Sequence, residues 1–337
     1  MKEQTSGNKG LLHKLIGSKY FELSGLILLI IIYSIFVQIK SGGIFLTGGN
    51  PINIMKEIVV YGILSCALAF PLINGTFDLS IESTCALGGT CAGLMVTKGL
   101  YGLTTSLPAA IIIAILICCV VGAINGVIVA YTTIDPFIVT LGMQTAIRGV
   151  VYIVDNNTAV TGIPANFKAL SNYQLAGLSV SIWILIGIFI LMAIVLGKTS
   201  FGRKIYAIGG NYQAAYASGI NVKQIRLLTY VIAGGLSAVA GILSTARVST
   251  ATPSAASGYT TIAISACAIG GVSLGGGKGT TIGVFLGALM MGMITNGMNL
   301  MGVGSNWQYV VRGALMILAV FYAQWFNTFS LRFIEKG

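Results

Sequence analysis

Long apolar stretches alternate with short polar or glycine-rich segments along nearly the whole chain. Most of these stretches are about 17 to 25 residues long, enough for a helix to cross a bilayer core of roughly 30 Å. The pattern predicts an all-α, polytopic integral membrane protein of about ten transmembrane helices, some of them broken. The predicted spans are residues 23–39, 58–74, 79–97, 107–131, 137–154, 180–197, 227–246, 259–272, 282–300 and 309–326.

Glycine-rich turns precede two of the predicted helix starts. Asn74-Gly75-Thr76 is followed by Phe77-Asp78-Leu79-Ser80, and the glycines between 270 and 279 are followed by Thr280. Side-chain oxygens of Asp, Ser and Thr can cap the free N–H groups of a helix, so we expect Asp78 to be a helix N-cap. Broken helices in membranes usually surround a pathway.

Polar and basic residues concentrate in the segment 198–226, which has five basic residues and no acidic residue. Alternating the spans from a cytoplasmic N-terminus places this segment inside, as the positive-inside rule favours, and places both termini in the cytoplasm. The predicted division is a cytoplasmic N-terminal segment at 1–22, a transmembrane domain at 23–327 that contains the cytoplasmic loop 198–226, and a cytoplasmic tail at 328–337.

Composition agrees with a membrane protein. Hydrophobic residues make up 55% of the 337 residues and charged residues only 8%, against roughly 25% charged residues in soluble domains. The mean hydropathy is +0.91. Helices in lipid associate through small residues, which accounts for the 45 glycines. The net charge of +11 resides mainly in short loops, so we expect no nucleic-acid partner.

Catalytic and metal-binding motifs are absent from the sequence. The six cysteines lie within apolar segments, where they are expected to be packing residues, and the only histidine is His13. The stretch from Gly275 to Thr281 is not a phosphate-binding loop. That motif requires glycine where this chain has Val272, and Ser or Thr where it has Gly279. We expect a non-enzymatic chain without a catalytic residue, metal or cofactor, driven by a gradient or by another subunit.

Polar side chains inside the spans are candidates for a translocation pathway, because they avoid lipid and face an interior. The candidates are Asp78, Ser80, Glu82, Asn125, Gln144, Asn296 and Asn299. Each of them also fits a second interpretation, a hydrogen bond between helices. Glu82 either stabilises the start of its helix or faces a polar cavity. For Glu57, Arg148 and Arg247 we favour positions at helix ends with side chains that reach the headgroups.

A short helix is predicted over Tyr212–Ala217, between the glycines of Gly209-Gly210-Asn211 and the capping glycine of Ser218-Gly219. Such a helix on the inner face fits a groove on another protein. The alternative is a solvated loop.

Several motifs together resemble the ribose-type permeases of bacterial ABC importers. They are Gly202-Arg203-Lys204-Ile205-Tyr206-Ala207-Ile208-Gly209-Gly210-Asn211 with Ala214-Ala215 and Ser218-Gly219-Ile220-Asn221-Val222, Phe77-Asp78-Leu79-Ser80, Arg247 with Pro253 and Gly258-Tyr259, Gly270-Gly271-Val272-Ser273-Leu274 with Gly276-Gly277-Lys278-Gly279, and Asn296-Gly297 with Asn299-Leu300. The resemblance covers the chain from the first span to the last.

The resemblance implies a multi-pass permease of the bacterial plasma (inner) membrane. It also implies partners: a second copy or a sister permease, ATP-binding subunits that hold ATP and Mg, and an extracytoplasmic substrate-binding protein. The family's coupling helix would lie in the loop 198–226, with Arg203, Gly209, Gly210, Asn211, Gln213, Ala214, Ala215, Ser218 and Gly219 at the contact. Gln213, Tyr216 and Glu82 depart from residues that are common in the family.

The function implied is import of a simple sugar, a ribose-like pentose or a hexose, by alternating access driven by ATP. A nucleoside or an autoinducer-like furanose is the alternative substrate. A gradient-driven carrier or channel that acts alone remains a different class of function, although the chain has few mid-span acidic groups for proton coupling.

Overall fold

The chain folds almost entirely into helices, as the computed structural model shows for the residues that it describes, 19–335. One helix lies on each predicted span: α2 (Lys19–Lys40), α3 (Asn50–Ile73), α4 (Ile81–Met95), α5 (Leu107–Tyr131), α6 (Pro136–Val154), α8 (Val180–Lys198), α11 (Val222–Val248), α12 (Tyr259–Ile269), α13 (Thr281–Leu300) and α14 (Ser305–Glu335). The remaining elements are short: α7 (Ala165–Asn172), β1 (Gln174–Leu175), β2 (Leu178–Ser179), α9 (Ser200–Gly210) and α10 (Tyr212–Ala217). The strands β1 and β2 pair as a small antiparallel hairpin. The all-α prediction is confirmed, and most of the predicted N-terminal segment 1–22 lies outside the described residues.

Helix length divides the spans into two groups. Within the described part of the chain, seven helices are long and apolar enough to cross a membrane: α2, α3, α5, α6, α8, α11 and α13. By contrast, α4 has 15 residues and α12 has 11. At 1.5 Å per residue they extend about 22 Å and 16 Å, which is short of a bilayer core. Each of the two lies next to one of the glycine-rich turns predicted from the sequence, α4 after the first and α12 before the second.

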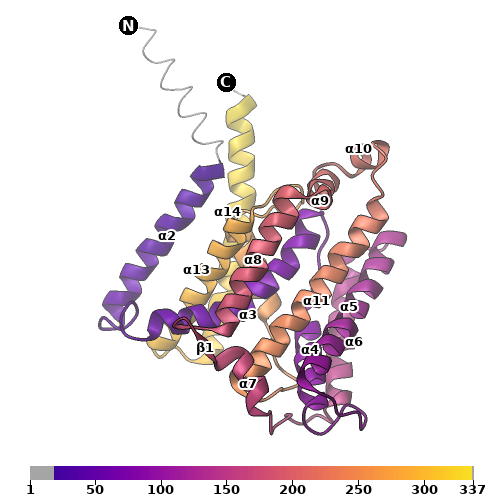
Figure 1. Cartoon of the computed structure of the whole chain (residues 1–337). Helices are drawn as coiled ribbons and strands as arrows, with labels where there is room; N and C mark the ends of the chain where they lie inside the picture. The colour runs from indigo at the N-terminus through magenta and orange to yellow at the C-terminus, as the bar shows by residue number, and fades with distance from the viewer. Residues whose placement is uncertain (1–18, 336–337) are drawn as a thin grey trace.

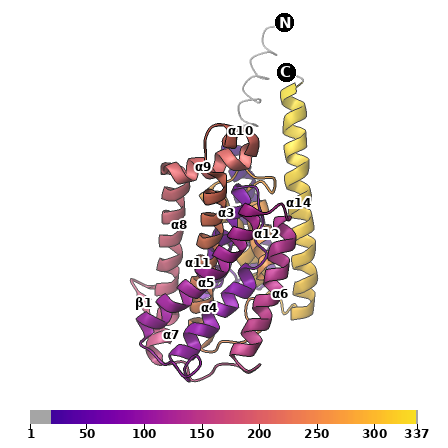
Figure 2. The same ribbon diagram turned by 90° about the vertical axis from the view of Figure 1, so that its right-hand side faces the viewer.

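The two ends of the bundle carry different connections (Figure 1). At one end lie α9 and α10, together with the start of α2 and the last turns of α14. We call this the α9 end. The opposite end, which we call the α7 end, carries α7 and the β-hairpin. In the second view α9 runs across the top of the bundle and α14 stands along one side (Figure 2).

Helices α3 and α11 form the centre of the bundle. Of the most apolar window of α3, 89% is buried, against 11% for α2. Helix α11 packs on α5, α4 and α3. The contacts are close because glycines replace side chains: Gly241 meets the carbonyl of Cys85 on α4, and Gly234 meets that of Cys118 on α5. The six cysteines are all free, and all except Cys119 are buried, as expected of packing residues.

The two glycine-rich turns cap the helices that follow them in different ways. Thr280 is the N-cap of α13, and its side chain accepts a hydrogen bond from the Gly283 amide, as predicted. The predicted N-cap role of Asp78 is wrong in position. The N-cap of α4 is Ser80, and Asp78 Oδ1 accepts from the Ser80 amide at 2.9 Å. Asp78 therefore satisfies a backbone N–H from outside the helix.

Candidate substrate path and coupling surface

A charged cluster joins the starts of both broken helices. Glu82 lies in the first turn of α4. Its Oε1 accepts a hydrogen bond from Gln144 Nε2 at 2.8 Å and lies 3.6 Å from Arg148 Nη2, and its Oε2 accepts from the Thr260 amide, at the start of α12, at 3.2 Å. We call Glu82, Gln144, Arg148 and Thr260 the Glu82 cluster. A carboxylate is favourable at a helix N-terminus, so Glu82 stabilises α12 as well as α4.

Arg148 contradicts the prediction that its side chain reaches the headgroups. It lies well inside α6, and its side chain is only 16% exposed. Besides pairing with Glu82, its Nη1 donates to the carbonyls of Pro253 and Ala255 at 2.6 and 2.9 Å. Arg148 therefore holds the connection between α11 and α12 in place.

A chain of three hydrogen-bonded polar side chains begins two residues before Glu82 in the sequence, at Ser80. Asn125 Nδ2, on α5, donates to Ser80 Oγ at 2.9 Å, and Ser80 Oγ donates to Asp78 Oδ1 at 2.6 Å. All three side chains are buried. Of the seven predicted pathway residues, the structure thus brings Asp78, Ser80 and Asn125 together in one chain, and Glu82 and Gln144 in the cluster.

The other two predicted pathway residues lie elsewhere, near the end of α13. Asn296 Oδ1 accepts from Asn50 Nδ2 at 2.9 Å, and Asn299 Oδ1 accepts from Gln308 Nε2 at 2.8 Å. These bonds connect α13 to α3 and to α14. The contacts fit the second interpretation, hydrogen bonding between helices.

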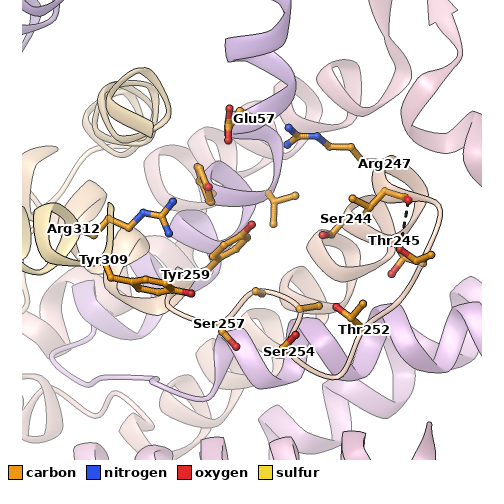
Figure 3. Close-up of a pocket in the computed structure, with 16 residues that line it drawn as sticks. Glu57, Ser244, Thr245, Arg247, Thr252, Ser254, Ser257, Tyr259, Tyr309 and Arg312 are labelled. Carbon is orange, nitrogen blue, oxygen red and sulfur yellow. Dashed lines mark hydrogen bonds between the residues drawn. The ribbon is translucent and has the colours of Figure 1, made fainter. Parts of the chain in front are cut away.

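A pocket of about 510 Å³ lies between α3, α11, α12 and α14 (Figure 3). Glu57, Arg247 and Arg312 bring charge to it, and Tyr61, Tyr259 and Tyr309 bring aromatic rings. Hydroxyl groups complete its lining at Ser244, Thr245, Thr250, Thr252, Ser254 and Ser257. We call this the Glu57 pocket. Within the described residues, no three His, Cys, Asp or Glu side chains gather to hold a metal.

The sequence did not predict that Glu57, Arg247 and Arg312 line one pocket. Arg247 is exposed in the last turn of α11, as predicted for a helix end, and it donates to the Lys56 carbonyl at 3.3 Å. Glu57, however, lies two turns into α3 and faces the pocket (Figure 3). A local signal was present: Tyr61 follows Glu57 by four residues, and Arg312 follows Tyr309 by three, so each pair shares a helix face.

Glycine backbones connect α9 to both interrupted helix pairs. A Cβ atom on Gly209 would lie 2.5 Å from the Gly277 amide nitrogen and still closer to the Ile73 carbonyl oxygen. One on Gly276 would lie 2.7 Å from Gly75 Cα. The Gly277 amide also donates to the Ile73 carbonyl at 2.9 Å. The turns after α3 and α12 therefore meet each other and α9 at one point, which we call the glycine contact.

The predicted short helix is present as α10, with the predicted bounds. Asn211 caps it by accepting from the Ala214 amide at 3.0 Å, and Gly219 has a positive φ of 78° after it. Of the nine predicted coupling residues, Ala215 is buried and Gly209 packs in the glycine contact. The others are exposed: Arg203, Gly210, Asn211, Gln213, Ala214, Ser218 and Gly219. They form one polar surface at the α9 end.

Comparison with known proteins identifies relatives over nearly the whole length. The chain is 35% identical over 314 residues to the ribose import permease protein RbsC of Escherichia coli (strain K12), covering 90% of this chain and 96% of that protein. It is 35% identical over 298 residues to RbsC of Bacillus subtilis (strain 168), covering 88% and 89%. It is 34% identical over 281 residues to the L-arabinose ABC transporter permease protein AraH of Azospirillum brasilense, covering 83% and 81%.

No solved structure matches the chain. The family described as branched-chain amino acid transport system / permease component matches residues 50–320, from the first residue of α3 into α14. That range contains the Glu82 cluster, the Glu57 pocket and the glycine contact. The chain therefore belongs to this family of membrane transport permeases.

Proposed function

We propose that the chain is the membrane-spanning permease subunit of an ATP-driven importer for a simple sugar such as a pentose. The observation that carries this proposal is the glycine contact, where an exposed polar segment meets both broken helix pairs. A permease without a nucleotide site needs such a connection between an external motor and its pathway. The similarity to ribose and L-arabinose permeases supports a sugar as the substrate.

In this proposal the α9 end faces the cytoplasm of a bacterial cell and all ten helices on the predicted spans belong to the transmembrane domain 23–327. The segment 198–226 at this end has five basic residues and no acid. Toward the α7 end the basic residues are scattered over several elements, at Lys40, Lys56, Lys98, Lys168 and Arg247. The positive-inside rule favours that orientation, and it puts both helix α2's start and α14's end on the cytoplasmic side.

The surface of α10 and its flanks binds an ATP-binding subunit, which holds ATP and Mg. Its exposed residues include no acid, so a cleft with acidic rims complements it. Movement of α9 displaces the turns after α3 and α12, because the glycine backbones are in direct contact and no gap separates them. Those turns precede α4 and α13, and α4 carries Glu82. Two permeases with two ATPases and an extracytoplasmic binding protein make up the working importer.

The test is sugar uptake into vesicles that contain the purified chain with and without its ATPase and binding protein. We expect uptake of D-ribose or L-arabinose only when all three components and ATP are present. Uptake by the chain alone, driven by an ion or sugar gradient, would contradict the proposal and identify a carrier or channel.

A further inference from the structure

We propose that the Glu57 pocket is a binding site for the imported sugar within the permease, with the Glu57 carboxylate as its central acceptor. This inference rests on the proposed function, and it names the place where the permease itself contacts a neutral monosaccharide.

Glu57 is a half-buried carboxylate that interacts electrostatically with Arg247 and Arg312 but makes no direct contact with either. Among the described residues it makes no hydrogen bond and no ion pair within 4.0 Å, whereas Glu82 uses both oxygens. An acidic group inside a membrane protein is costly unless it is paired or serves a function. A carboxylate has two acceptor oxygens, so it can receive hydrogen bonds from two adjacent sugar hydroxyls.

Donors face the same space. Figure 3 shows the Glu57 carboxylate between Arg312 on one side and Arg247 on the other. Arg312 Nε is buried without a hydrogen-bond partner, and Nη2 reaches Gln308 Oε1 only at 3.4 Å. A guanidinium carries several donors in a fixed fork, so a hydroxyl or ring oxygen of the ligand can satisfy it. The hydroxyl side chains of the 249–258 connection can donate or accept at the rim.

Aromatic rings give the pocket an apolar wall. Tyr61 and Tyr259 pack edge to face with ring centroids 4.8 Å apart, and Tyr309 lies beside them under Arg312. Tyrosine combines an apolar ring with a polar tip. This combination suits a sugar, which has apolar C–H faces and a polar rim. The volume of about 510 Å³ is in the range of roughly 300–1,000 Å³ that small-molecule sites occupy.

The pocket is connected to the rest of the proposed mechanism. Its lining comes from the first half of α3, the first turns of α14 and the last turns of α11, so it lies toward the α7 end. Arg148 holds the carbonyls of Pro253 and Ala255, and Glu82 holds the Thr260 amide directly after Tyr259. The pocket wall is therefore tied to α4 and α6. A displacement of α4 can then open or close the site.

The experiment measures protection of a cysteine at the pocket by the sugar. Ser254 is exposed and lines the pocket, so S254C, in a Cys119→Ser background, reports access to it. Gln174 is exposed at the same end but outside the pocket, so Q174C is the matched control. The full importer in cells is labelled with a membrane-impermeant maleimide. The probe is whichever of D-ribose and L-arabinose the wild-type complex imports. S257C serves as a second reporter if S254C does not fold.

We expect the sugar to slow labelling of S254C roughly threefold at a free concentration of about twice its Kd, with no effect on Q174C. The protection should disappear in E57Q/S254C, while E57Q still co-purifies with the ATPase. Equal protection with and without Glu57, protection only by a sugar acid, or no protection in a complex that imports the sugar would overturn the inference. Absence of ATP-dependent import by the wild-type complex would instead contradict the proposed function.

Discussion

At the α9 end, α9 meets the turns after α3 and α12 through glycine backbone atoms, whereas at the Glu82 cluster α4, α6 and α12 meet through charged and amide side chains. The two contacts lie on the same broken helices but differ in stiffness. Backbone atoms in contact have no rotamers to change, so the glycine contact transmits a displacement directly. Side chains can reach the same partner from several rotamers, so the Glu82 cluster can hold its elements through a change in their spacing.

The largest effect is expected from a methyl group at the glycine contact. In G209A the new Cβ would collide with backbone atoms of Ile73 and Gly277. Overpacking costs about 1–3 kcal/mol where side chains can adjust and more where they cannot. We expect loss of about 3 kcal/mol or more, seen as a large fall in the melting temperature of the purified protein.

The neighbouring glycine is the matched control for stability. A Cβ on Gly210 meets nothing within 4 Å. Since alanine favours a helix over glycine by about 1 kcal/mol, G210A should melt at the same or a higher temperature. Equal destabilisation by the two variants would contradict the close contact at Gly209.

The next effect concerns the Glu82 cluster. R148M removes the cation from a mostly buried carboxylate and the donor to two carbonyls of the 249–258 connection. Removing one partner of a buried ion pair costs about 3–5 kcal/mol. We expect the lower end of that range, because Glu82 keeps its bonds to Gln144 and Thr260. The measurement is the free energy of unfolding in detergent, and a variant as stable as wild type would show that the pair is not formed.

A double variant separates the charge from the hydrogen bonds. In E82Q/R148M no isolated charge remains, so the double variant should be more stable than R148M alone by about 1 kcal/mol. The full cycle of E82Q, R148M and the double variant gives the coupling energy. Strict additivity of the two single changes would mean that Glu82 and Arg148 act independently.

The smallest effect is expected at the Asp78, Ser80 and Asn125 chain. N125A removes one neutral hydrogen bond, worth about 1 kcal/mol. We expect a small fall in the melting temperature and a somewhat lower uptake rate, because Ser80 loses the donor that orients it. A complete loss of uptake in a stable N125A protein would place Asn125 in direct contact with the substrate.

Local signals in the sequence were enough for α10 and for the position of every long helix. Asn211, the alanines and Gly219 each act within one turn, so their effect does not depend on the rest of the fold. For Arg148 the local pattern predicts a position at a helix end, which is wrong. Its correct partner, Glu82, is on another helix and could not be identified from local pattern.

Contacts between distant segments account for what the sequence did not predict. The sequence around Gly209 predicts a hinge beside a short helix, and no residue in that segment indicates that Gly277 is its neighbour in the fold. The Glu57 pocket combines residues of α3, α11 and α14, each of which fits a helix end or a packed face by itself. Long-range packing decides such sites, and one sequence carries no direct record of it.

The measurement that tests the central proposal most directly is co-purification of the ATPase subunit with A214E. Ala214 is exposed on α10, so glutamate there leaves the fold intact but adds bulk and negative charge to the proposed contact. The proposal predicts a permease with normal melting temperature that neither retains the ATPase nor imports sugar, while Q174E, on the exposed hairpin of the α7 end, does both. An A214E permease that retains its ATPase and imports sugar at the wild-type rate would contradict the proposal.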